Sequence, residues 1–283
     1  MTGTSGRSGR EEQARIDALP TPLLRRAANP MLMLSGAANV VMQLSRPEIG
    51  WAVATSDAPS SLFNDPSRRR RTTVGYLAVA THGTAAERAA FRRGVNQSHA
   101  PVRSGPGSAV GYDAMDPEQQ WWVAACLYRG LEETCELVHG PADRESLLAE
   151  GLVLGGLLQM PAAAWPTSRA AFEATWREGV AAIRIDPEVR DFLLCVIAMR
   201  YLPRPPPVAL AERRLRLTTG FLPPEFRAEM RLPWTPDDQR WFNRLTTRAA
   251  GVVRQLPRGG QEYPFNASIR GVRKRIARGL PPM

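Results

Sequence analysis

Lysine is almost absent from this chain of 283 residues, because Lys274 is the only one and every other basic residue is arginine. So strong a preference reflects genome composition more plausibly than a surface built to follow phosphates. No nucleic-acid recognition motif is present, and we expect no nucleic-acid partner. The formal net charge of +10 is concentrated in residues 1–28, in 68–71 and in 258–283, which leaves the remainder close to neutral.

Cysteine is also scarce. The three residues Cys126, Cys135 and Cys195 are an odd number, contain no CxxC pair and lie in apolar, helix-spaced stretches. This pattern is typical of a reduced compartment, so we expect a cytoplasmic protein. No apolar run reaches the length that spans a bilayer, and the first residues lack the apolar segment of a signal peptide.

Helix-start signals recur along the chain. Asp116-Pro117, Asp186-Pro187 and Thr235-Pro236 each place a capping side chain before a proline, and Thr84 with Glu87 forms a capping box. A cap accepts a hydrogen bond from a backbone N–H that lacks an intrahelical partner, and a first-turn proline has no such N–H. Apolar residues at helical spacing follow these starts, and no useful strand alternation is present. The sequence predicts helices near 30–55 with a break at Pro47, 70–82, 85–99, 117–139, 142–159, 168–183, 187–201, 208–219 and 236–256.

We therefore predict an all-α protein with a single multi-helix globular domain over residues 29–257. Residues 1–28 are predicted to be a basic N-terminal segment, of which about the first 20 are rich in glycine, serine and charge and are expected to be disordered. Residues 258–283 are predicted to be a basic C-terminal tail.

His99 is the first candidate for chemistry among the three histidines. It ends a predicted helix whose inward positions, Phe91 and Val95, precede it at intervals of four residues, and Pro101 follows. An imidazole on an apolar face needs either a hydrogen bond or a metal as its partner. The spacing leaves both readings open. His82 and His139 each precede a glycine and are interpreted as residues that end helices.

Arg69 and Thr73 are the second candidate, because a helix would place them four residues apart on one face. A run of arginines is commonly a solvated surface. If this face turns inward, the guanidinium and hydroxyl would share a pocket and could hold a carboxylate or polarise bound oxygen.

Several stretches together resemble the MpaB/rubber-oxygenase family, which includes latex clearing proteins. They are Leu34–Pro47, Arg69–Gly83, Val95–Arg103 with its Asn-Gln-Ser-His99-Ala-Pro-Val-Arg, Gly111–Pro117 followed by Trp121-Trp122-Val123, and Leu232-Pro-Trp-Thr-Pro. Their order and spacing match that family over about residues 30–257.

The resemblance implies a helical, globin-like packing around a buried pocket that holds haem b. By residue match, His99 would be the axial iron ligand, and Arg69 and Thr73 would be pocket residues. The implied reaction uses dioxygen on a small apolar, possibly unsaturated, isoprenoid-like substrate. Asp57, upstream of the arginine run, is a candidate catalytic base.

Two features differ from the family pattern. Ser104 follows Arg103 where the family often has glycine, and no lysine stands near Arg69 and Thr73, as one does in the rubber-cleaving branch. The resemblance therefore does not extend to rubber as the substrate. Two alternatives stay open: a haem-free member of the family that acts as a binding or scaffold protein, and a surface binder that acts through its basic ends.

Overall fold

The architecture follows from helices that each bury one apolar stripe against their neighbours. The computed structural model describes residues 3–55, 64–105, 108 and 110–282. Within these residues the secondary structure is helical, with one isolated bridge between Arg103 and Asp113 and no named strand. The helices are α1(Gly3–Ala18), α2(Pro22–Ala27), α3(Met31–Leu44), α4(Pro47–Ala54), α5(Pro66–His82), α6(Ala85–His99), α7(Pro117–His139), α8(Arg144–Leu157), the short 3-10 helix η1(Ala162–Ala164), α9(Arg169–Ala181), α10(Pro187–Ile197), α11(Val208–Phe221), α12(Pro224–Glu229), α13(Pro236–Gln255), α14(Arg258–Gln261) and α15(Phe265–Ala277). The all-α prediction is confirmed.

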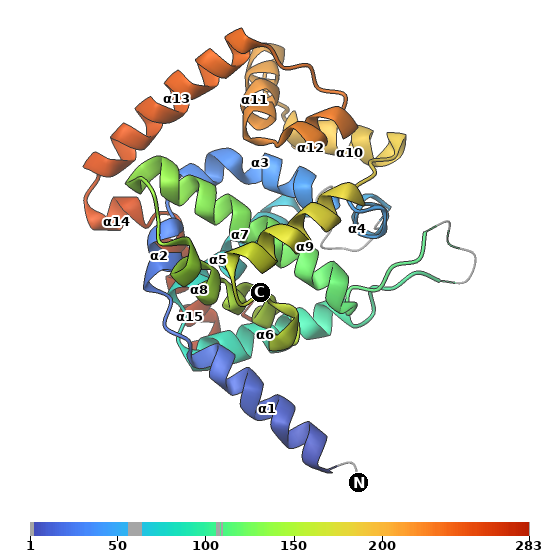
Figure 1. Cartoon of the computed structure of the whole chain (residues 1–283), viewed down its shortest axis with the longest axis vertical. Helices are drawn as coiled ribbons and strands as arrows, with labels where there is room; N and C mark the ends of the chain where they lie inside the picture. The colour runs from blue at the N-terminus through green and yellow to red at the C-terminus, as the bar shows by residue number, and fades with distance from the viewer. Residues whose placement is uncertain (1–2, 56–63, 106–107, 109, 283) are drawn as a thin grey trace.

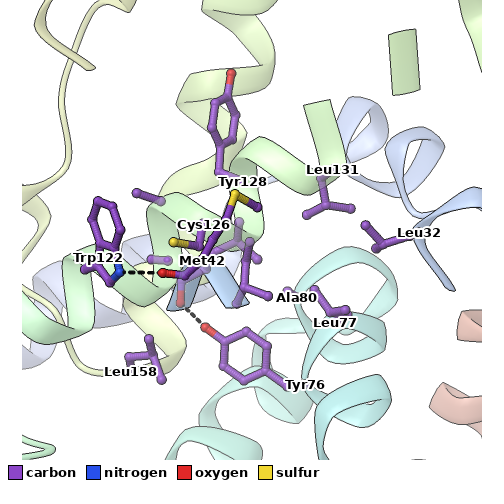
Figure 2. Packing of buried hydrophobic residues seen from close by; sticks show 14 of the residues in the cluster. Leu32, Met42, Tyr76, Leu77, Ala80, Trp122, Cys126, Tyr128, Leu131 and Leu158 are labelled. Atoms are coloured by element: carbon purple, nitrogen blue, oxygen red, sulfur yellow. Dashed lines mark hydrogen bonds between the residues drawn. The ribbon is translucent and has the colours of Figure 1, made fainter. Parts of the chain in front are cut away.

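The long helix α7 runs through the middle of the molecule and packs against α3, α8 and α13 (Figure 1). Its buried side is mostly apolar, and the Trp122 indole N–H donates to the Met42 carbonyl of α3 at 3.0 Å. Figure 2 shows this contact beside Tyr76 of α5, whose hydroxyl donates to the Leu154 carbonyl of α8. Because burying a polar group without a partner is costly, these two bonds allow large aromatic side chains to lie in the core.

The predicted caps are confirmed with one exception. Asp116 accepts from the backbone N–H groups of Glu118 and Gln119 at 2.8 and 3.0 Å, and the Thr84–Glu87 capping box is present. Asp186 makes no capping bond, because its carboxylate accepts from the Trp51 indole N–H at 2.9 Å instead. That aspartate thus joins α4 to α10.

Both ends of the chain are more ordered than the sequence suggested. Residues 1–20 were expected to be disordered, yet Gly3–Ala18 forms α1, which packs against α6 and α8 and buries Ile16. Composition alone indicated disorder because most of α1 is polar. The helix is held in place by its contacts with α6 and α8. An ion pair between Asp17 and Arg92 of α6 adds to them.

The predicted C-terminal tail likewise contains a helix that belongs to the core. α15 lies along α5 and buries Phe265, Ile269 and Val272, which recur at helical spacing. Its basic residues occupy the opposite, exposed side. The segment predicted as a basic C-terminal tail thus contains an amphipathic helix over residues 265–277.

Candidate functional site at the α5–α6 hairpin

The α5–α6 hairpin brings Arg69 and His99 together. The two helices are joined by Gly83 and Thr84 and run antiparallel, and the rings of Tyr76 and Phe91 meet edge to face at 6.2 Å. Arg69 lies two turns before Tyr76 on α5, and His99 lies two turns after Phe91 on α6. Since the chains run in opposite directions, the start of α5 and the end of α6 are neighbours.

His99 is half-buried, and its Nδ1 atom is fully buried and has no hydrogen-bond partner among the described residues. Burial lowers the pKa of His99, and the positive charge of Arg69 lowers it further. Both causes favour the neutral imidazole, which is the form that ligates metals. The histidine thus has an unused buried nitrogen and a ring kept uncharged at neutral pH.

Arg69 is in contact with solvent, although the surrounding protein partly desolvates its guanidinium. Its side chain is exposed, but the surrounding protein still lowers its pKa by desolvation. Because Arg69 is in contact with water, its guanidinium is charged and reachable by a ligand. No hydrogen bond or ion pair joins its side chain to another described residue. It is therefore available to an anionic or oxygen-bearing group.

Thr73 shares the face of Arg69 but has a different environment from the one predicted for a pocket residue. It is exposed, and its hydroxyl donates to the Arg69 carbonyl at 3.0 Å. The hydroxyl oxygen keeps its acceptor lone pairs, so Thr73 can still receive a hydrogen bond. Asp57, the predicted base, lies outside the described residues.

No group of three or more potential metal-ligating side chains occurs in the described part of the chain, so a protein-only metal centre finds no support there.

Tyr76 and Phe91 were not singled out from the sequence as residues that align the site. The seven-residue interval between Arg69 and Tyr76 was the available signal, since it places both near one side of a helix.

The placement of Arg69 predicts that its charge acts on His99. Replacing Arg69 by leucine should raise the pKa of His99, because the repulsive positive charge is lost, while burial should still hold the pKa below its ordinary value. NMR titration of the cofactor-free protein measures this directly, with the His99 signal assigned through His99→Ala. Arg270→Leu, an exposed change on α15, is the control. An unchanged pKa in Arg69→Leu would contradict the proximity of the two groups.

His82 lies at the other end of the hairpin and is far more buried than its position at a helix end suggested. Its side chain is 4% exposed, its Nδ1 lies 2.7 Å from the Thr81 hydroxyl, and its Nε2 lies 3.8 Å from a Glu262 carboxylate oxygen. Burial, followed by the charges of Arg25 and Arg273, lowers its pKa to about 4, although Glu262 opposes the shift. His82 is thus a neutral histidine packed among charged groups.

This environment predicts acid sensitivity. In the unfolded chain His82 binds a proton below about pH 6.5, whereas in the folded protein it does so only near pH 4. The free energy of unfolding therefore decreases as the pH falls from 6.5 to 4. His82 alone should contribute a loss of about 2 kcal/mol between about pH 7.5 and about pH 5. Glu133, whose pKa burial raises to about 7, changes the stability in the opposite sense over the same interval, so the contribution of His82 is the difference between the wild type and His82→Gln. Urea unfolding at several pH values measures it. Relative to the wild type, His82→Gln should gain about 2 kcal/mol between about pH 7.5 and about pH 5, and His139→Gln should gain much less; an equal slope in all three proteins would exclude His82 as a source.

The features now described define a class: an all-α protein with an unpartnered, neutral histidine and a free arginine at the open end of a helical hairpin. Residues 24–254 match the family model described as "ER-bound oxygenase mpaB/B'/Rubber oxygenase, catalytic domain". The chain belongs to this family. The resemblance noted from the sequence is thereby confirmed, and with it the membership of an oxygenase family.

Two mycobacterial relatives are similar over nearly the whole chain. They are the uncharacterized protein Mb2261 of Mycobacterium bovis and the uncharacterized protein Rv2237 of Mycobacterium tuberculosis. Each is 39% identical over 251 residues, which cover 87% of this chain and 98% of the relative. No solved structure matches the chain. Among the described residues, the helices are either too short or too polar to cross a membrane.

Proposed function

We propose that the protein is a haem b-dependent oxygenase that uses dioxygen on a small apolar substrate, possibly unsaturated and isoprenoid-like. The observation that carries the proposal is His99: a buried ring nitrogen without a partner, on a neutral imidazole, at the position that matches the family's axial ligand. The missing partner is what a bound iron would supply. The chemistry of His99 therefore fits a haem ligand, which supports the proposal.

His99 would hold the iron, and Arg69 would hold a haem propionate or orient bound oxygen. When bound, haem b supplies the oxygen chemistry that side chains cannot perform. Arg69 would place a fixed positive charge beside the site, and this charge would stabilise negative charge that develops on the reacting groups. Thr73 would accept a hydrogen bond at the same edge. Asp57 as a base stays a prediction.

The local packing supports an apolar lining next to the histidine. Phe91 and Val95, which precede His99 on α6, are 1% and 5% exposed, and Gly75 faces the Phe91 ring. Apolar side chains exclude water and favour an apolar substrate. The globin-like arrangement and a cytoplasmic location belong to this proposal as well.

The first test is the visible absorption spectrum of protein purified after expression with a haem precursor. We expect a Soret band whose intensity corresponds to nearly one haem per chain. Far-UV circular dichroism of the same sample should show a helical protein. A featureless spectrum from folded, haem-supplemented protein would contradict the proposal and favour a haem-free binding or scaffold role.

A further inference from the structure

Helices α11 and α13 form an outer face at one end of the molecule, away from the α5–α6 hairpin (Figure 1). The Arg216 guanidinium of α11 stacks over the Trp241 ring of α13 at 4.4 Å and pairs with Asp238 at 2.7 Å. These contacts fix the two helices side by side. Arg216 thereby has its charge neutralised within the protein.

Two adjoining hollows of about 370 and 320 Å³ follow this face. Arg213 and Trp241 line both hollows, so we treat them as one surface and call it the arginine groove. The residues around it are Ala209, Glu212, Arg213, Arg216, Trp241, Arg244, Leu245 and Arg248. Its lining is thus basic, with one aromatic and two small or aliphatic side chains.

Three arginines of the groove have no partner in the part of the chain that the structure describes. Arg213, Arg244 and Arg248 are exposed, and none makes a hydrogen bond, ion pair or ring contact with another described residue. Glu212 is the one acidic side chain among the described residues that line it. No carboxylate pairs with these three guanidiniums among the described residues. The groove therefore carries a local excess of positive charge.

An apolar stripe continues the groove along α13. Trp241, Leu245, Val252 and Leu256 recur at helical spacing beside Arg244 and Arg248. Val252 is 62% exposed and Leu256 is 36% exposed, although the neighbouring side of the helix is buried through Phe242, Thr246, Ala250 and Val253. The outer side of α13 therefore shows aliphatic groups and guanidiniums together.

We propose that the arginine groove and this apolar stripe dock the protein on an anionic lipid surface. Arg213, Arg244 and Arg248 bind phosphate groups of the lipid headgroups, and Val252 and Leu256 contact the upper acyl chains. Guanidinium recognises phosphate by paired hydrogen bonds, and aliphatic side chains add affinity in proportion to the area they bury. A nucleic acid would use the charges but leave the aliphatic groups without a role.

The docking surface goes beyond the proposed oxygenase activity and does not depend on haem. It has a consequence for that activity, because apolar substrates partition into lipid. A protein bound at the lipid surface would meet such a substrate at a far higher local concentration than in water.

Vesicle co-sedimentation of the full chain tests the proposal. Vesicles of phosphatidylcholine and phosphatidylglycerol in equal amounts should bind the protein, vesicles of phosphatidylcholine alone should not, and added salt should weaken binding. The triple variant Arg213→Glu, Arg244→Glu, Arg248→Glu should bind the anionic vesicles about a hundredfold more weakly, since each surface arginine contributes on the order of fivefold. Val252→Asp should weaken binding as well.

The matched control reverses three exposed arginines elsewhere, Arg93, Arg200 and Arg270, and so makes the same change in net charge. It should retain most of the binding, and circular dichroism should show that both triple variants are folded. Equal losses in the two triple variants would overturn the docking surface in favour of general charge attraction. Stabilisation of the protein by inorganic pyrophosphate through the same arginines, without vesicle binding, would overturn the lipid assignment in favour of a soluble phosphate ligand.

Discussion

Replacing His99 by alanine is expected to leave a folded helical protein and, under the proposed function, to lower its haem content by more than about tenfold, because the imidazole that would bind the iron is lost. His99 makes no hydrogen bond through Nδ1 to another described residue, so the substitution removes no stabilising bond at that atom. We expect the free energy of unfolding to change by less than about 1 kcal/mol. The measurements are the ratio of Soret to protein absorbance and a urea unfolding curve.

His139→Ala is the matched control, because His139 also ends a helix, α7, and is partly exposed. It should keep the wild-type haem content. Haem occupancy of His99→Ala equal to that of the wild type would contradict the ligand assignment, even if the wild-type protein contained haem.

Replacing Arg88 by methionine is expected to lower the free energy of unfolding by about 3–5 kcal/mol, which is the range for removing one partner from a buried, charge-bearing network. Arg88 is 3% exposed and lies at the first turn of α6. Its guanidinium donates to the carbonyls of Val79, Ala80, Asp17 and Leu19 and to the Thr21 hydroxyl. Methionine keeps the apolar stem but leaves these acceptors in the interior without donors.

The same substitution at Arg93 provides the control, since that residue lies on the same helix, is exposed and has no described partner. Its effect should stay within about 0.5 kcal/mol. Urea unfolding followed by circular dichroism measures both variants. A loss of less than about 1 kcal/mol in Arg88→Met would mean that water can replace the guanidinium.

Much of the fold was readable from the sequence because its signals are local. Capping residues, first-turn prolines and apolar stripes placed the long helices with errors of a few residues at their ends. Gly140 ends α7 with a φ of 78°, a conformation that glycine adopts without strain. Local signals were weak for α1, which is mostly polar, whereas the helical spacing of Phe265, Ile269 and Val272 in α15 was present in the sequence but was outweighed by the positive charge of the segment.

The site shows the same division. The sequence singled out Arg69 and His99 separately, and the antiparallel course of α5 and α6 explains why they meet. It interpreted His82 as the end of a helix because the partners that surround it, Arg25, Glu262 and Arg273, come from remote segments. The arginine groove was not predicted from the sequence, because the contribution of Arg213 beside Arg244 and Arg248 requires the packing of α11 on α13.

The position of α15 along α5 bears on how the protein should be produced. The stretch that matches the family model ends at residue 254, before α15 begins. A shortened version cut at that boundary would strip Phe265, Ile269 and Val272 from α5 and uncover an apolar strip on the very helix that carries Arg69. The limits of sequence similarity are therefore not the limits of the folding unit, and a failure of the shortened version to bind haem would say nothing about the full chain.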